Sequence, residues 1–174
     1  MNLQEKKLKS KTVYSGRIVT LEIDDVELPD GKISLRECVR HSGGAAVLLI
    51  KENKILLVNQ YRYLYGQPIY EIPAGKLNKG EDPQIAAARE LEEETGYKAV
   101  LSHLLDIYPT PGYTDEIIHI YFAESYEISN QNLDEGEFLN YCFMDVETVL
   151  KMIENGEIKD AKTIVALYKY LLTK

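Results

Sequence analysis

Polar and apolar residues alternate along the first forty positions, which is typical of strands with one buried face. The alternation runs through Val13–Tyr14 and Arg17–Leu28 and resumes over Ile33–Arg40. The intervening Pro29-Asp30-Gly31-Lys32 predicts a turn, because proline fixes φ and glycine permits a positive φ. We therefore expect an antiparallel meander over residues 1–40.

Short apolar runs predict further strands in the middle of the chain. Two of them, Ala45–Ile50 and Lys54–Gln60, are joined by Lys51-Glu52-Asn53 and predict a second hairpin. Later strands are predicted, in chain order, at Ile69–Ile72, Ala99–Tyr108, Ile117–Glu124 and Asn140–Met144. Pro73-Ala74-Gly75 is expected to end the first of these later strands.

Three segments have the signals of helices. The clearest is Pro83–Thr95, because Asp82 can accept bonds from its first amides, a proline suits its first turn, and Gly96 can end it. Val146–Glu154 and Ala161–Leu172 follow near the end of the chain. Strands with helices between and after them predict an α+β fold, in which a mixed β-sheet is flanked by helices.

The composition is that of a soluble globular domain, with 45% apolar and 28% charged residues among 174. The net charge of -8 argues against non-specific binding to nucleic acid or to anionic membranes, so neither is expected as a partner. An anionic substrate remains possible, because bound Mg²⁺ can reverse the local charge of a site. Cys38 and Cys142 lack zinc spacing and are expected to be reduced and structural. The Lys-rich segment Met1–Lys11 lacks the apolar core of a signal peptide, so a cytoplasmic location is expected.

The predicted helix at Pro83–Thr95 concentrates carboxylates on one face. Successive helical residues rotate by about 100°, so Glu90, Glu93 and Glu94 share about one third of the circumference. Like charges at this spacing destabilise a helix by roughly 0.2–0.5 kcal/mol per pair, and the macrodipole disfavours acids in its C-terminal half. A divalent cation would remove both penalties. The helix alone is therefore either an ordinary solvated acidic face or a metal site.

The spacing around these glutamates favours the metal site. In order, it consists of Gly75, five residues, Glu81, seven residues, Arg89-Glu90-Leu91, one residue, Glu93-Glu94, one residue, and Gly96-Tyr97. This pattern resembles the Nudix box of the Nudix hydrolases at every fixed position. The final slot usually holds an aliphatic residue, and Tyr97 departs from it.

The resemblance extends beyond the box. The flanking segments are Gln60-Tyr61-Arg62, Glu71-Ile72-Pro73-Ala74-Gly75-Lys76 and Pro109-Thr110-Pro111-Gly112-Tyr113-Thr114-Asp115-Glu116. They are similar to the ADP-ribose pyrophosphatase branch of the family, for which a proline about fifteen residues past the box, here Pro111, is the usual marker.

This resemblance implies a Nudix fold, with a mixed β-sheet sandwiched between helices and preceded by an N-terminal antiparallel sheet. Residues 1–40 would form a subdomain for dimerisation and substrate binding, and residues 41–174 the hydrolase domain. The implied activity is Mg²⁺-dependent hydrolysis of ADP-ribose to AMP and ribose 5-phosphate by a cytoplasmic homodimer, with Mn²⁺ as an alternative metal. Another nucleoside diphosphate sugar or a dinucleotide remains open as substrate. A nucleotide sensor without turnover also remains open, although the complete glutamate set argues against it.

The resemblance also assigns residues to the metal. Glu90 and Glu94 are the expected ligands, Glu93 is a ligand or supports one, and the backbone carbonyl of Ala74 completes the set. Glu81 is expected to lie one step further from the metal. Arg89 is expected to hold neighbouring glutamates, because a guanidinium fork suits a carboxylate.

Other residues are assigned to the substrate and to water activation. Glu116 is the expected general base, with the neighbouring Asp115 as a solvated acid. Arg62 is the expected phosphate ligand, unless it is an ordinary surface arginine, and Arg36 and Arg40 are further candidates for that role. Glu71 either contacts the base or ribose of the substrate or is a structural partner. The candidates for stacking on adenine are Tyr14, Tyr61 and Tyr113, although most of the 13 tyrosines must be packing groups.

Overall fold

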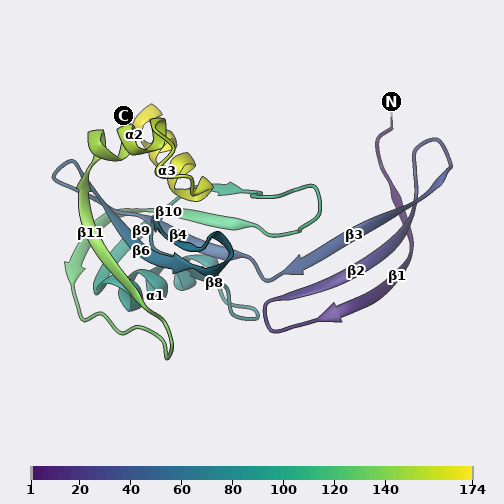
Figure 1. Ribbon diagram of the computed structural model, residues 1–174, viewed down its shortest axis with the longest axis horizontal. Helices are drawn as coiled ribbons and strands as arrows, with labels where there is room; N and C mark the ends of the chain where they lie inside the picture. Colours follow the sequence, from purple (N-terminus) through teal and green to yellow (C-terminus); the bar gives the residue numbers. More distant parts are fainter. Residues whose placement is uncertain (1, 174) are drawn as a thin grey trace. The chain divides into compact units, whose positions relative to one another are not determined.

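The computed structural model describes residues 2–173, which form two compact units (Figure 1). Unit 1 consists of Met1–Gly43 and Tyr108–Ile117, and unit 2 consists of Gly44–Ile107 and Ile118–Lys174. The second segment of unit 1 therefore comes from the middle of the chain, which the periodicity of the sequence did not predict.

Unit 1 is built on a three-stranded antiparallel sheet of order β1-β2-β3. Its strands are β1 (Lys6–Ser15), β2 (Val19–Glu27) and β3 (Ile33–His41). The predicted meander is confirmed, but β1 begins seven positions before the predicted Val13. Every residue of β1 is exposed, so no face of this edge strand is selected for apolar side chains, and its N-terminal half has no alternation to detect.

Unit 2 contains two four-stranded sheets between helices. In Figure 1, helix α1 (Pro83–Thr95) covers one side of the strands, and helices α2 (Val146–Glu154) and α3 (Ala161–Leu172) cover the other. All three helices have the predicted bounds. Asp82 accepts hydrogen bonds from the amides of Gln84 and Ile85, and Gly96, with φ of 71°, ends α1.

The first sheet of unit 2 has the order β8-β4-β10-β9. Its strands are β4 (Gly44–Leu48), β8 (Ala74–Lys76), β9 (Tyr97–Ile107) and β10 (Ile118–Ile128). The pair β4–β10 is parallel and the other pairs are antiparallel, which makes the sheet mixed. The strand predicted at Ile69–Ile72 ends before Pro73, as expected, but the short strand β8 that follows was not predicted, and its Ala74 and Gly75 pair with β4.

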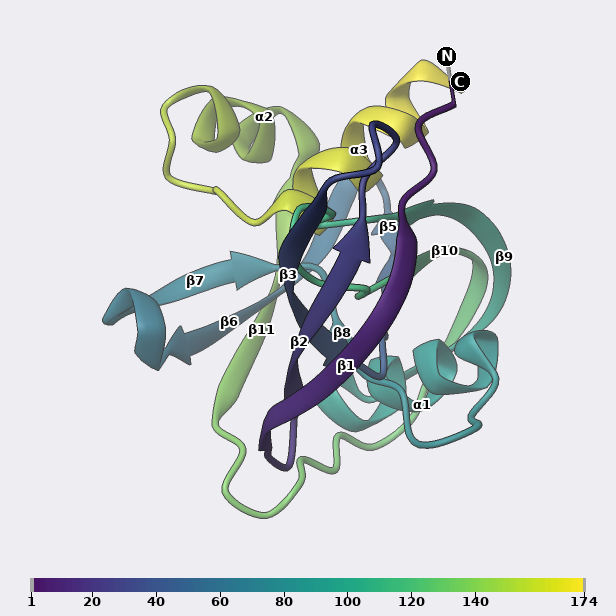
Figure 2. The same ribbon diagram turned by 90° about the vertical axis from the view of Figure 1, so that its right-hand side faces the viewer.

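The second sheet has the order β11-β6-β5, and β7 also pairs with β6. Its strands are β5 (Ile50–Lys51), β6 (Lys54–Arg62), β7 (Gln67–Glu71) and β11 (Leu139–Asp145). Strands β6 and β7 form a projecting hairpin whose tip is the 3₁₀ turn η1 (Tyr63–Tyr65), as Figure 2 shows. The predicted hairpin of Ala45–Ile50 with Lys54–Gln60 is wrong in its main part, since only β5 pairs with β6. Strand β4 is buried at every residue and is a central strand of the first sheet.

Two apolar clusters hold unit 2 together, one on each helical side. The α1 side includes Val47, Ala87 and Leu91, and the α2–α3 side includes Leu48 and Leu167. Among residues 2–173, no helix combines the length and apolar character needed to cross a membrane. Both cysteines are free.

Three positions of the first sheet lie in one row. Ile118 of β10 pairs with Gly44 of β4 on one side and with Ile107 of β9 on the other. These are the three positions at which the chain passes between the units.

Candidate active site

Arg89 on α1 gathers three carboxylates. Its Nε donates to Glu81 Oε1 at 2.9 Å, and its Nη1 donates to Glu90 Oε1 at 2.8 Å and to Glu93 Oε2 at 2.9 Å. These contacts, first of all the hydrogen bonds to Glu81, raise the pKa of the Arg89 guanidinium above its usual range. The arginine thus remains charged and holds the loop before α1 against the acidic face of the helix.

Gly75 makes room for Glu90. A Cβ atom at residue 75 would lie 1.9 Å from Glu90 Cδ and 2.1 Å from its Oε1, far inside van der Waals contact. Only glycine therefore lets the Glu90 carboxylate lie against β8. The fourteen residues between Gly75 and Glu90 in the box separate two positions that the fold brings face to face.

Glu94 is the most deeply buried glutamate of α1. The residue is 3% exposed, and its Oε2 accepts a hydrogen bond from the backbone amide of Ala74 at 3.0 Å. Burial raises the pKa of Glu94 to about 8, with smaller contributions from Glu137 and Glu90, while the Ala74 amide opposes the shift. Burial likewise raises the pKa of Glu90, against the opposing effect of Arg89. These two carboxyl groups therefore lack enough positive charge for their burial.

The side chains fit a divalent cation. Mg²⁺ prefers oxygen ligands and keeps several waters, so it needs only one or two carboxylates from the protein. Within residues 2–173, no three His, Cys, Asp or Glu side chains already converge as a metal cage. Arg89 instead donates hydrogen bonds to carboxylate oxygens of Glu90 and Glu93, and the Ala74 amide donates to a carboxylate oxygen of Glu94. A cation would relieve the charge deficit at Glu90 and Glu94.

A second, separate network surrounds Glu71 at the end of β7. Arg62 of β6 donates from Nε to Glu71 Oε1 at 2.6 Å and from Nη2 to Oε2 at 2.9 Å. Lys162 of α3 donates to the same carboxylate and to Asp160 at 3.0 Å. Burial alone would raise the pKa of Glu71, but Arg62 and Lys162 outweigh it and lower that pKa below its usual range. Glu71 is therefore a paired, ionised carboxylate within the protein.

In unit 1, the segment Tyr108–Ile117 is bound to the end of β3. The Val39 amide donates to the Tyr113 carbonyl at 2.7 Å, and Asp115 Oδ1 accepts from the His41 amide at 2.9 Å. Asp115 Oδ2 also accepts from Arg40 Nη1 at 3.2 Å. Asp115 thus anchors this segment while its side chain remains exposed to solvent, as expected.

Glu116 lies beside His41 in unit 1, with Oε1 3.4 Å from His41 Nδ1. The same Nδ1 accepts a hydrogen bond from the Gly43 amide at 3.1 Å. The Glu116 carboxylate therefore lies beside a ring nitrogen that also contacts the Gly43 backbone. No role was predicted for His41, because a lone histidine at the end of a strand has no pattern to interpret.

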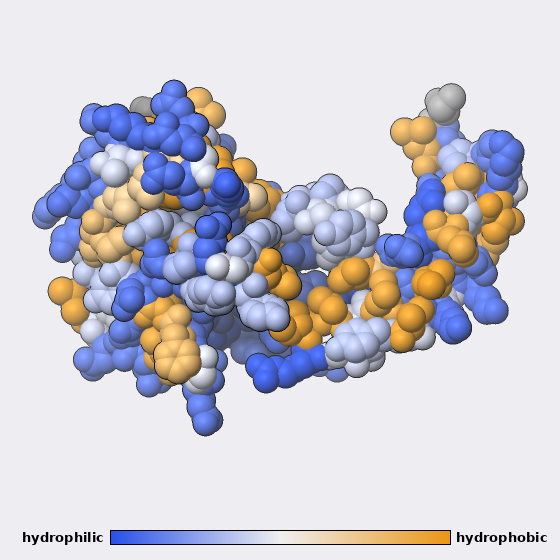
Figure 3. Space-filling view, in the orientation of Figure 1, coloured by the Kyte–Doolittle hydropathy of each residue, from blue (hydrophilic) through white to orange (hydrophobic). Residues whose placement is uncertain are grey.

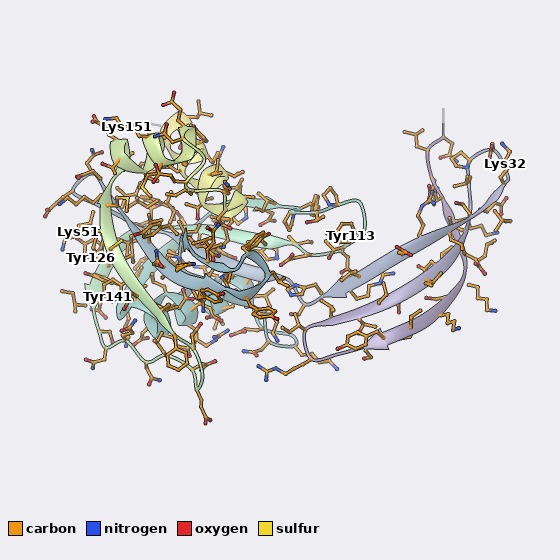
Figure 4. The ribbon with its side chains drawn as sticks, viewed as in Figure 1. Lys32, Lys51, Tyr113, Tyr126, Tyr141 and Lys151 are labelled. Carbon is orange, nitrogen blue, oxygen red and sulfur yellow. The ribbon has the colours of Figure 1, made fainter. Side chains whose placement is uncertain are left out.

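The remaining substrate candidates are variously engaged. Arg36 pairs with Glu5 in unit 1, with Nε 2.9 Å from Glu5 Oε2. Tyr14, Tyr61 and Tyr113 are all more than half exposed, and Figure 4 shows Tyr113 on the segment that follows β9. Each of the three rings is therefore accessible, and their exposure does not discriminate between them.

Tyr97, which departs from the Nudix box, has an apolar environment. Its ring packs edge-on against Tyr126, Tyr141 and Phe143, with ring centroids 5.7, 6.3 and 5.6 Å away. Lys51 lies over the Tyr126 ring at 5.5 Å, in the group labelled in Figure 4. Tyr97 therefore packs in the apolar interior, as the usual aliphatic residue would.

Two charged residues near these networks, Glu137 and Lys162, were missed at the level of sequence. Glu137, just before β11, contributes to the raised pKa of both Glu90 and Glu94, and it accepts from Gln60 Nε2 at 3.4 Å. Asp160 and Lys162 come from the first turn of α3, 91 positions after Glu71 in the case of Lys162. No spacing rule links such distant positions.

Comparisons with known proteins agree with this geometry. The model of the NUDIX domain matches residues 40–167, and the model of the nucleoside diphosphate sugar hydrolase N-terminal domain matches residues 5–39. The chain belongs to the Nudix family. The predicted resemblance is thus confirmed.

Similar proteins include several Nudix relatives of nearly the same length. A methanol dehydrogenase activator of Bacillus methanolicus is 47% identical, over 94% of this chain and 91% of the relative. An ADP-ribose pyrophosphatase of Bacillus subtilis (strain 168) is 45% identical, over 99% of this chain and 95% of the relative. A GDP-mannose pyrophosphatase of Cronobacter sakazakii is 31% identical, over 96% and 95%.

The fold of this Nudix protein also matches a solved structure. The crystal structure of an ADP compounds hydrolase superposes with a TM-score of 0.85 at 23% identity, covering 98% of this chain and 94% of the other. The α+β Nudix fold is therefore confirmed.

Proposed function

We propose that this Nudix protein hydrolyses the pyrophosphate bond of ADP-ribose to AMP and ribose 5-phosphate, with Mg²⁺ as its metal and Mn²⁺ as the alternative. The observation that carries the proposal is the pair Glu90 and Glu94, buried against β8 without enough positive charge. The substrate is suggested by the Bacillus subtilis relative, which is named ADP-ribose pyrophosphatase and matches 99% of this chain.

In the proposed mechanism, Glu90 and Glu94 bind the metal, with Glu93 as a ligand or support and the Ala74 carbonyl as a backbone ligand. A bound Mg²⁺ supplies charge at the phosphate oxygens and lowers the pKa of a bound water. Arg89 keeps Glu81, Glu90 and Glu93 in place through its guanidinium group. The proposed metal ligands therefore all lie on two regular elements, α1 and β8.

Arg62 is the proposed phosphate ligand, and Arg36 and Glu71 are proposed to assist in holding the substrate. The pairing with Glu71 uses Nε and Nη2 of Arg62, so within residues 2–173 Nη1 has no hydrogen-bond acceptor and can donate to a phosphate oxygen. Glu71 thereby sets the plane of the guanidinium group.

The reaction is tested by incubating the purified protein with Mg²⁺ and a panel of ADP-ribose, sugar nucleotides and dinucleotides. We expect AMP and ribose 5-phosphate from ADP-ribose, and none after removal of the metal with a chelator. Glu90→Gln should abolish turnover, while Glu92→Gln, on the same helix, should not. Binding of ADP-ribose without any product would instead identify a nucleotide sensor.

A different nucleoside diphosphate sugar is the second candidate substrate. Two observations favour it: the match of residues 5–39 to a nucleoside diphosphate sugar hydrolase N-terminal domain, and the 31% identity to a GDP-mannose pyrophosphatase. The box determines the chemistry and leaves the leaving group open. A kcat/KM for GDP-mannose above that for ADP-ribose would establish this alternative.

Glu116 is the proposed general base, since it follows the segment that the ADP-ribose branch uses for this purpose. We expect Glu116→Gln to lower kcat by about 100-fold or more while leaving metal affinity unchanged. The matched variant is Glu137→Gln, because Glu137 lies within electrostatic reach of Glu90 and Glu94. Normal turnover in Glu116→Gln together with a loss in Glu137→Gln would transfer the role to Glu137.

A cytoplasmic homodimer is also proposed, with unit 1 in the interface. Exposed apolar side chains lie along its three strands and their connections, as the orange surface in Figure 3 illustrates. They are Leu8, Val13, Tyr14, Ile18, Ile33 and Leu35. Exposed apolar patches of this kind are typical of protein interfaces. Light scattering at micromolar concentration should give twice the mass of the chain, and the mass of a monomer would contradict the proposed dimer. Fractionation of cells tests the proposed cytoplasmic location.

A further inference from the structure

The first turn of α3 binds the end of β7 through two adjacent residues. Thr163 Oγ1 accepts a hydrogen bond from the Ile72 amide at 2.8 Å and donates to Asp160 Oδ2 at 2.6 Å. Lys162 bridges the carboxylates of Glu71 and Asp160. Thr163 is fully buried, so the Ile72 amide has no access to water as a substitute partner.

This contact begins a continuous series of restraints that ends at the proposed metal ligands. Glu71 is held by its side chain and Ile72 by its amide. The Pro73 carbonyl then accepts from the Val47 amide at 2.9 Å, and the Ala74 amide donates to Glu94 at 3.0 Å. Four consecutive residues are thus fixed, and the first two depend on α3.

We propose that Lys162 and Thr163 are positioning residues for the hydrolytic site: Thr163 fixes the Ile72–Ala74 backbone against Glu94, and Lys162 orients Arg62 through Glu71. The inference rests on the proposed function for its substrate. The two residues act on different parts of the site, so they have different kinetic signatures. Thr163 controls the metal, whereas Lys162 controls the nucleotide.

The role of Lys162 follows from how the Glu71 charge is shared. Glu71 Oε2 receives both Arg62 Nη2 and Lys162 Nζ. Without the lysine, Arg62 alone would balance a carboxylate that is 3% exposed, and it would be drawn towards Glu71 and away from a phosphate. Lys162→Met should therefore raise KM for the nucleotide by about 10-fold with a smaller change in kcat, and Lys162→Arg, which keeps the charge, should restore most of the affinity.

The role of Thr163 is tested by replacing only its hydroxyl group. Thr163→Val keeps the shape but loses both hydrogen bonds, and it should weaken metal binding by about 10-fold or more. Thr163→Ser keeps the hydroxyl and should bind metal within about 2-fold of the wild type. Mn²⁺ titration by calorimetry, without nucleotide, measures this independently of turnover. If the wild type hydrolyses nothing in the panel, the proposed function fails, and this titration still decides the role of Thr163.

A structural control separates positioning from loss of stability. Ala166 lies on the buried face of the same helix, in the apolar cluster that also contains Ile72, and its methyl side chain cannot form a hydrogen bond. Ala166→Gly should therefore lower the melting temperature while the hydrogen bonds from Thr163 to Ile72 and from Lys162 to Glu71 stay in place. We expect it to leave both KM and Mn²⁺ affinity near wild-type values. The proposal is overturned if Ala166→Gly shifts these constants as much as Thr163→Val and Lys162→Met, or if those two variants leave them unchanged.

Discussion

Glu71 and Glu94 are equally buried in unit 2, each 3% exposed, yet the pKa values of their carboxyl groups are shifted in opposite directions. The pKa of Glu71 is lowered, because Arg62 and Lys162 supply more favourable charge than burial removes. The pKa of Glu94 is raised to about 8, because the Ala74 amide and the more distant Lys162 do not offset its burial and the nearby charges of Glu137 and Glu90. The two carboxyl groups therefore differ in the positive charge of their neighbours and not in their burial.

The difference separates a completed ion-pair network from an incomplete one. A buried charge without a partner is costly, and proteins retain such groups mainly at sites with a function. Glu71 has its cations within the chain. Glu94 faces Ala74 and Glu90, where the missing charge has to come from outside, as a proton or a metal ion. The following changes test this contrast, in order of expected effect.

Glu94→Gln should produce the largest loss. The substitution keeps size and removes the charge that the proposed metal requires, so we expect kcat/KM to fall by about 1000-fold, or ~4 kcal/mol. Folding should be unaffected, because a neutral group suits this burial better. Glu92→Gln, at a half-buried position two residues earlier whose carboxylate is bound by Ser129 and Lys98, is the control. Activity within about 10-fold of the wild type would show that Glu94 is not a ligand.

Glu71→Gln should instead damage stability. It leaves the Lys162 ammonium buried with only Asp160 and removes the anion from Arg62, so the free energy of unfolding should drop by about 3 kcal/mol. Denaturation by urea measures this, with Glu94→Gln as the matched comparison. A loss of stability in Glu94→Gln but none in Glu71→Gln would reverse the interpretation of both sites.

Arg89→Lys should have an intermediate effect. A lysine keeps the charge but cannot reach Glu81, Glu90 and Glu93 with a planar fork, so the glutamates would lose their fixed orientation. We expect about 10- to 100-fold lower activity, and partial recovery at high Mg²⁺ concentration. An unchanged rate at low Mg²⁺ would show that these contacts do not organise the metal site.

The smallest effect is a pH dependence of stability without metal. Between the unfolded value near 4.5 and about 8, Glu94 keeps its proton in the folded state and loses it in the unfolded state. Stability should therefore fall as pH rises through this window, by at most ~1.4 kcal/mol per unit. Glu71 acts in the opposite sense, since its stabilising contribution is lost as pH falls below its unfolded value. Thermal unfolding of the wild type and Glu94→Gln across this range, with and without Mg²⁺, should show the steepest falling slope in the metal-free wild type, with a smaller slope left in Glu94→Gln because the pKa of Glu90 is also raised.

Local signals in the sequence were sufficient for the helices and for the acidic face of α1. Asp82 and Gly96 fix the ends of α1 by interactions within four residues, so its bounds could be predicted. The family spacing likewise identified Glu90 and Glu94 before their burial was known. Strand pairing was less accessible, because Ala46 of β4 finds its partners, Ala74 and Ile120, 28 and 74 positions away.

The charged networks were also hard to predict, because their members lie far apart in the sequence. Glu71 was left open between a substrate contact and a structural partner, and the partner that decides its environment, Lys162, is 91 positions distant. A lysine is normally a solvated residue, so nothing in its neighbourhood indicates burial. Glu137 was missed for a related reason, since it lies in a segment without periodicity.

The row formed by Gly44, Ile107 and Ile118 has a practical consequence for dissecting the protein. Ile107 and Ile118 are already antiparallel partners, so for unit 2 the ten residues Tyr108–Ile117 are simply a hairpin loop. A gene encoding residues from Gly44 onward, with this loop shortened to a two-residue turn, would leave the register of the β8-β4-β10-β9 sheet unchanged. In genetic terms, unit 1 consists of a segment before Gly44 and an insertion between Ile107 and Ile118. Both can be deleted at positions that lie in a single row of the sheet.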